Sequence, residues 1–218
     1  MSGARTAAVS LALLTWLLAA VSCRSDSKVV LSPEMAERQL SRRGIPYREK
    51  TFVERARKGD LLAVRLFIAA KMNPNVTDEE GETALIAAAG QGHTKIVERL
   101  IAINAKVDQR NREGLNALLR AARNGKGDVV RALLDRQSDI NAQGPDGGTA
   151  LMYAVWSNSH TIVQTLLDRG ADITARDVDG STSLTWAVFY NRASIVQTLL
   201  ERGADPDTKN NLGGTALM

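Results

Sequence analysis

The chain is 218 residues long, with 24% charged residues, only 4% aromatic residues and one cysteine, so a disulfide framework is excluded and an aliphatic core is expected. Its formal net charge of +4 comes from one region: residues 24–58 hold ten Lys or Arg against five Asp or Glu, whereas residues 59–218 hold seventeen against nineteen. Because the larger part of the chain is not basic, we expect no nucleic-acid partner.

Residues 1–22 have the features of an export signal. Arg5 supplies a positive charge, and residues 9–21 form an apolar core that is shorter than the about 20 residues a membrane-spanning helix needs. Cys23, the single cysteine, follows directly after Ala20-Val21-Ser22. This segment resembles the lipobox of bacterial lipoproteins, and the resemblance implies acylation of the Cys23 sulfur and a membrane anchor in the bacterial cell envelope. The alternative is conventional cleavage after Ser22, for which the small residues before the cysteine are also suitable.

Residues 23–46 are predicted to form a polar tether. One helix is expected within it, with Ser32 as N-cap, Pro33 in the first turn and Gly44 as the stop. Met35 and Leu40 are its few apolar residues, so we predict a spacer that holds the rest of the chain away from a membrane. The positive charge of this region would favour an anionic lipid surface, or it would simply keep a linker solvated.

From about Tyr47 onward the sequence repeats with a fixed period. A turn glycine recurs every 33 residues, as Gly81, Gly114, Gly147, Gly180 and Gly213. A period of this size is typical of a solenoid, in which each unit buries its apolar face against its neighbours. We therefore divide this ankyrin-sized array into units 47–80, 81–113, 114–146, 147–179 and 180–212, followed by a truncated unit 213–218.

Each unit is predicted to hold two helices, a tight turn between them and an extended finger. The first helix carries a leucine and, three residues later, an alanine, while the second carries aliphatic residues spaced i, i+1, i+4, i+5. The turns contain residue types that tolerate a positive φ angle, namely Gly92, Gly125, Asn158 and Asn191. The sixth unit stops at Met218 inside its first helix, so we expect a truncated sequence in which Leu199 and Leu200 are partly exposed.

Three segments share a threonine, a leucine two residues later and an alanine at the end: Thr83–Ala88, Thr149–Ala154 and Thr182–Ala187. They resemble the Thr-Pro-Leu-His-x-Ala signature of the ankyrin-repeat family, without its proline and histidine. The resemblance implies an all-α ankyrin-repeat solenoid with β-hairpin fingers, covering residues 47–218, and a protein partner bound in the concave groove. The threonine hydroxyl is expected to cap each first helix.

The sequence offers little for catalysis. His93 is predicted to be structural because it follows a turn glycine, and His160 has no second histidine or cysteine at a metal-ligand spacing. Ser157, Ser159 and Asp168 lie near His160, but no glycine-flanked nucleophile motif surrounds either serine. We therefore predict no enzyme, no metal, no cofactor and no small-molecule substrate.

Aromatic residues gather on the first helices of the fourth and fifth units. Five of the eight that follow the signal segment lie there: Tyr153, Trp156, Trp186, Phe189 and Tyr190. The register places Tyr153 beside Trp186 and Trp156 beside Phe189. We predict that these five residues anchor a protein partner, while Arg120 and Arg123 attract an acidic group. The alternative is that the rings stack between units and fill the core.

The leading interpretation is a non-catalytic interaction module, exported and lipid-anchored through Cys23. Two other functions stay open: a regulatory or immunity-like inhibitor of an envelope enzyme, and an enzyme that uses His160. Capture of a partner would separate the first two, because an inhibitor lowers the activity of the enzyme that it binds.

Overall fold

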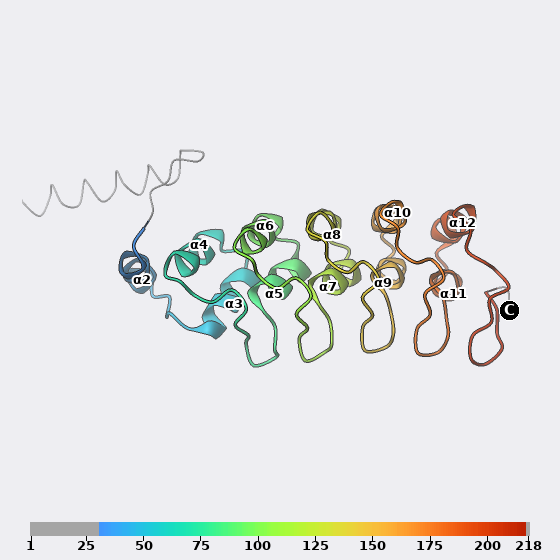
Figure 1. The fold of residues 1–218 in the computed structure, drawn as a ribbon, viewed down its shortest axis with the longest axis horizontal. Coiled ribbons are helices and arrows are strands. Elements are labelled where there is room, and N and C mark those ends of the chain that lie inside the picture. Colours follow the sequence, from blue (N-terminus) through green and yellow to red (C-terminus); the bar gives the residue numbers. More distant parts are fainter. Residues whose placement is uncertain (1–30, 217–218) are drawn as a thin grey trace, which may run out of the picture.

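The computed structural model describes residues 31–216, and its helices form one elongated array (Figure 1). The expected export signal, Cys23, the first part of the tether and the last two residues lie outside the described residues. Within residues 31–216 the regular secondary structure is helical, and the expected all-α solenoid is confirmed.

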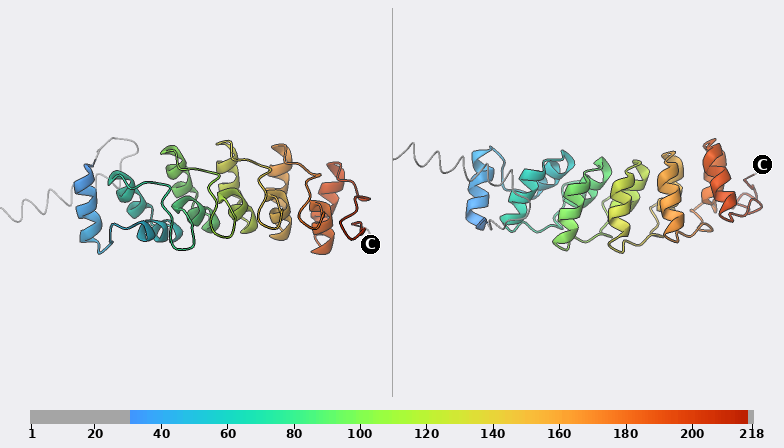
Figure 2. Two further views of the ribbon diagram at one scale, coloured as in Figure 1. Left: turned by 60° about the horizontal axis from the view of Figure 1, so that its bottom comes forward. Right: turned by 90° about the horizontal axis from the view of Figure 1, so that it is seen from above.

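Each unit contributes a pair of antiparallel helices. The first helices occupy one row and the second helices a parallel row, while the fingers project beyond the first helices (Figures 1 and 2). In chain order the pairs are α3 (Glu49–Arg57) with α4 (Leu61–Ala69), α5 (Ala84–Gln91) with α6 (Thr94–Ala102), α7 (Ala117–Arg123) with α8 (Gly127–Leu134), α9 (Ala150–Trp156) with α10 (His160–Asp168), and α11 (Ser183–Phe189) with α12 (Ala193–Glu201).

Helix α2 (Pro33–Arg42) has the predicted ends but a different role from the predicted one. The Ser32 hydroxyl accepts a hydrogen bond from the Met35 amide at 3.3 Å, and Gly44 follows with a φ of 65°. However, Ala36 and Leu40 lie four residues apart on one face and are fully buried against α4. The helix therefore covers the N-terminal end of the array and is not a free spacer.

The first helices start as their sequence predicts. Thr83 caps α5 by accepting a hydrogen bond from the Ile86 amide at 3.2 Å, and Thr149 and Thr182 act in the same way. Asn116, which replaces the threonine in the third unit, caps α7 through its side-chain oxygen at 2.9 Å from the Leu119 amide. The capping role is thus kept in every one of these four units.

The turns between the helices have the left-handed backbone that the residue types indicate. The φ angle is 86° at Gly92 and 54° at Asn158, and the equivalent positions in the other units are also positive. Asparagine is one of the few residues other than glycine that adopts this conformation readily. The change from glycine to asparagine after the third unit therefore preserves the turn.

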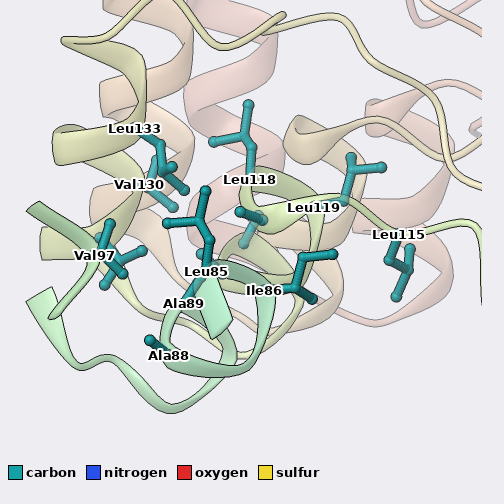
Figure 3. Packing of buried hydrophobic residues seen from close by; sticks show 14 of the residues in the cluster. Leu85, Ile86, Ala88, Ala89, Val97, Leu115, Leu118, Leu119, Val130 and Leu133 are labelled. Carbon is teal, nitrogen blue, oxygen red and sulfur yellow. The ribbon is translucent and has the colours of Figure 1, made fainter. Parts of the chain in front are cut away.

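The core is aliphatic and continuous along the array. Figure 3 shows how Leu85 and Leu118 of successive first helices lie together, with Val97, Val130 and Leu133 of the second helices packed on them. The alanines that follow, such as Ala88 and Ala121, are fully buried as well, and their small side chains allow the helices to approach closely. Leu199 is also fully buried, so the expectation of its partial exposure was wrong, whereas Leu200 is 43% exposed as expected.

The fingers are turns that bond to one another. The expected hairpins carry only isolated antiparallel bridges in the described residues, Thr77 with Thr83 and Gln143 with Thr149, because the two arms of a finger meet at one pair of residues. Backbone hydrogen bonds then link neighbouring fingers, for example from the Val178 amide to the Asp146 carbonyl at 3.0 Å. Each finger is thereby fixed relative to the next.

Candidate functional site

The predicted binding residues lie on one surface, formed by the fingers and the first helices, which we call the finger-side surface. They come from α7, α9 and α11 and from Tyr190, the residue that ends α11. We call the five rings of this surface the aromatic cluster: Tyr153, Trp156, Trp186, Phe189 and Tyr190. The structure divides the cluster into rings that support and rings that are exposed.

Tyr153 and Trp186 support the cluster. Their ring centroids are 6.1 Å apart in an edge-to-face arrangement, as the register predicts. The Tyr153 hydroxyl donates a hydrogen bond to the Asp146 carboxylate at 2.5 Å, and the Trp186 indole N–H donates one to the Asp177 carboxylate at 2.7 Å. Both rings are thus held by the finger of their own unit.

Tyr153 belongs more to the core than to the binding surface. Its side chain is only 5% exposed. Burial raises the pKa of the Tyr153 hydroxyl above its usual value, and the hydrogen bond to Asp146 and the charge of that carboxylate act in the same direction. The hydroxyl therefore stays protonated and keeps donating to Asp146, which fixes the position of the ring beneath Trp186.

Phe189 and Trp156 are the exposed members of the cluster. Phe189 is 80% exposed, although its ring contacts Tyr190 edge-on at 5.1 Å, and Tyr190 in turn lies 5.9 Å from Trp186. Trp156 is 42% exposed, with the Arg123 guanidinium 5.6 Å above its ring. The register predicted that Trp156 and Phe189 lie side by side; the ring contacts instead join Phe189 to Tyr190 and Trp156 to Arg123.

Arg120 takes part in a network of ion pairs that joins three units. Its guanidinium lies 3.1 Å from Glu82 and 2.8 Å from Glu113, and Glu82 also lies 3.0 Å from Arg57. The Glu82 side chain is only 7% exposed, so its charge depends on these partners. Arg120 is therefore engaged by internal carboxylates, and of the two arginines Arg123 is the more available to an acidic group from outside. Arg123 is 42% exposed and 3.9 Å from Glu113.

The sequence analysis missed the acidic partners of these side chains, although a signal was present. Glu113 precedes Arg120 by seven residues, and Asp146 precedes Tyr153 by the same distance. In both cases a finger acid accepts a hydrogen bond from the first helix of the next unit. The repeat therefore contains a finger-to-helix contact that comparison of the columns at this spacing would have indicated.

The side chains considered for catalysis are engaged elsewhere. His160 shares a hydrogen bond of 2.8 Å with Thr198, Ser157 donates to the Ala122 carbonyl at 2.9 Å, and Asp168 pairs with Arg202 at 2.6 Å. His93 lies 3.0 Å from the Arg57 carbonyl, which confirms its structural role between units. Each of these contacts joins neighbouring units, so these residues serve the stacking of the array.

Two further searches cover residues 31–216 only. Nowhere in this range do three or more potential ligands among His, Cys, Asp and Glu come together to hold a metal ion. None of the helices in the same range has the length and apolar character needed to cross a membrane.

Stacked helix pairs of constant length, joined by fingers and presenting an aromatic surface, define a helical repeat protein built for binding. A family model described as ankyrin repeats (3 copies) matches residues 53–144 and 138–210, well over half of the chain. The chain belongs to the ankyrin-repeat family. No curated protein matches it. Members of this family are typically non-catalytic binding modules, so the chain is a protein–protein interaction module.

Proposed function

We propose that the protein binds a partner protein through the aromatic cluster, with Phe189 and Trp156 as the contact residues and Arg123 beside them. The observation that carries this proposal is the exposure of Phe189, which is 80% open to solvent on a helix whose other large residues are packed. Exposed aromatic rings on a rigid support are typical anchors of protein interfaces. Tyr153, Trp186 and Tyr190 supply that support through their ring contacts.

Replacing Phe189 and Trp156 together by alanine is expected to weaken partner binding by about 2 kcal/mol or more, roughly a thirtyfold loss of affinity or greater. The partner is captured on immobilised full-length protein from a detergent extract of the native host's membranes. The Met35→Ala variant is the matched control, because Met35 is 50% exposed but lies on α2 at the far end of the array. Circular dichroism spectra should be unchanged in all variants.

A protein retained by wild type and by Met35→Ala but lost with the double variant would support the proposal. Equal retention by all three proteins would contradict it. If the captured partner is an enzyme, its activity with and without the protein tests the regulatory function.

We further propose that the protein is exported and anchored by lipid at Cys23. Support comes from the apolar residues 9–21 and from Ala20-Val21-Ser22 before the single cysteine. The described array starts soon after Cys23, so an anchor there would hold the α2 end near the membrane and leave the aromatic cluster at the far end.

The Cys23→Ser variant is expected to lose the anchor. Intact mass of wild type from the host membrane fraction should correspond to a chain that begins at Cys23 and carries acyl groups, and Cys23→Ser should move to the soluble fraction. A wild-type chain without added acyl mass would contradict lipidation and favour conventional cleavage after Ser22.

A further inference from the structure

The C-terminal end of the described array presents an apolar face, which we call the end face. It consists of Val188 on α11 with Arg192, Val196, Leu200 and Glu201 on and beside α12, around a shallow open groove of about 470 Å³. Val188 is 40% exposed, whereas Val155, the same position one unit earlier, is fully buried by the unit that follows. The end face is therefore an inter-unit stacking surface that remains uncovered in the single chain.

The ion pairs between units stop at the end face. Asp135 pairs with Arg169 of the next unit at 2.9 Å, and Asp168 pairs with Arg202 at 2.6 Å. Glu201 occupies the same column as these two acids, since the three positions are 33 residues apart. Within residues 31–216, however, Glu201 has only a hydrogen bond from Gln197 on its own helix, at 2.8 Å. It is the carboxylate that the pattern leaves without a cation.

Arg192 is the complementary unfulfilled group. Its Nε atom is buried without a hydrogen-bond partner in the described structure, and one Nη atom reaches only the Trp156 carbonyl, at 3.4 Å. A buried donor without an acceptor costs about 1–3 kcal/mol. The end face thus holds an unpaired carboxylate and an incompletely bonded guanidinium at the two ends of one helix.

These two charges also oppose the dipole of α12. Arg192 is the N-cap residue, where the helix carries partial positive charge, and Glu201 is the last helical residue, where the charge is negative. Both placements are unfavourable for an isolated helix. A neighbouring helix that ran antiparallel and carried the same two residues would bring each charge to its opposite.

We propose that the end face binds a second copy of this chain, with the two α12 helices packed antiparallel about a two-fold axis. Arg192 of each copy then faces Glu201 of the other, while Val196 and Leu200, which follow Arg192 at four-residue intervals, meet between them. The axis passes between Val196 and Gln197, midway along the helix. Such a self-complementary contact closes as a dimer. It does not depend on the function proposed for the aromatic cluster.

Charge exchange tests the dimer with the full-length protein in analytical ultracentrifugation. Wild type should form a dimer, and Glu201→Arg or Arg192→Glu alone should weaken it at least about tenfold, because each places like charges opposite one another. The double variant should restore the dimer. Each single change relieves an unfavourable interaction with the helix dipole, so the monomer is not expected to unfold. Glu98→Arg, the same change on the exposed surface of α6, is the matched control and should leave the dimer intact.

A cysteine pair tests the position of the axis. In the Cys23→Ser background, Gln197→Cys places one thiol of each copy beside the axis, and mild oxidation should give a disulfide-linked dimer. Gln164→Cys is the matched control, because Gln164 is the exposed glutamine at the same position of α10 and should not cross-link.

Three results would overturn the proposal: a wild-type monomer at all soluble concentrations, a dimer that Glu201→Arg leaves unchanged, or equal cross-linking at both cysteine positions. A heavier species that contains another protein would show that the end face serves a different partner, and would also overturn it.

Discussion

Replacing Gly147 by alanine is expected to lower the free energy of unfolding by about 3 kcal/mol or more. The φ angle of Gly147 is 75°, and a residue with a side chain in such a conformation costs of order 1–3 kcal/mol. In addition, its Cβ would lie 2.7 Å from the Val178 nitrogen and 2.9 Å from the Asp177 carbonyl carbon. These are backbone atoms of the next finger, and the Val178 amide bonds to the Asp146 carbonyl, so they cannot move away without breaking that contact.

Gly114→Ala separates the two causes. Gly114 occupies the same column with a φ of 76°, but an added Cβ would meet only Pro145 side-chain carbons, at 3.4 Å or more. This variant should therefore lose only the cost of backbone strain. The measurement is chemical denaturation of both variants followed by circular dichroism. Equal losses would show that the approach of neighbouring fingers does not limit residue size at Gly147.

Replacing Leu118 by alanine is expected to cost about 3–4 kcal/mol. Leu118 is fully buried in the central unit, in contact with residues of both helix rows (Figure 3). The cavity would lie where neighbouring units meet, and backbone bonds between the fingers restrict how far the units can close over it. Leu62→Ala is the control, because Leu62 is 37% exposed on α4 and should lose less than half as much. Denaturation curves that showed similar losses would contradict a tightly packed centre.

The repeat architecture could be predicted because its signals are local and recur. A positive φ at Gly92 or Asn158, and a cap at Thr83 or Thr149, each depend on a residue type at a fixed place in the unit. The register also gave the neighbour of Tyr153 correctly, because stacking units by one period brings Trp186 beside it.

The docking of α2 could not be predicted in the same way. Its buried face has only Ala36 and Leu40, so the sequence reads as a weakly amphipathic, exposed helix. What buries these two side chains is the outer surface of α4, and that surface is complementary only after the first unit has folded. An end helix lies outside the 33-residue period, so no column indicates its partner.

The candidate site was predicted in its location and only partly in its roles. Exposure of Phe189 and burial of Tyr153 follow from small differences in where each ring points, although both lie on first helices. Arg120 has the composition of a binding residue, yet the two carboxylates that hold it come from a finger and from another unit. Such pairings depend on three-dimensional neighbours, which the sequence pattern alone specifies only for the framework.

The cover provided by α2 makes the two ends of the array unequal in their resistance to local opening. In a chain where each unit contacts only its neighbours, an uncovered end unit loses structure at a lower free energy than an interior one. Phe189 lies on that end unit, and Trp156 on the unit before it. A partner that grips both rings must therefore also hold the last two units closed, so part of its binding energy is spent on suppressing fraying, and its affinity reports on the order of the array's end as well as on the contacts themselves.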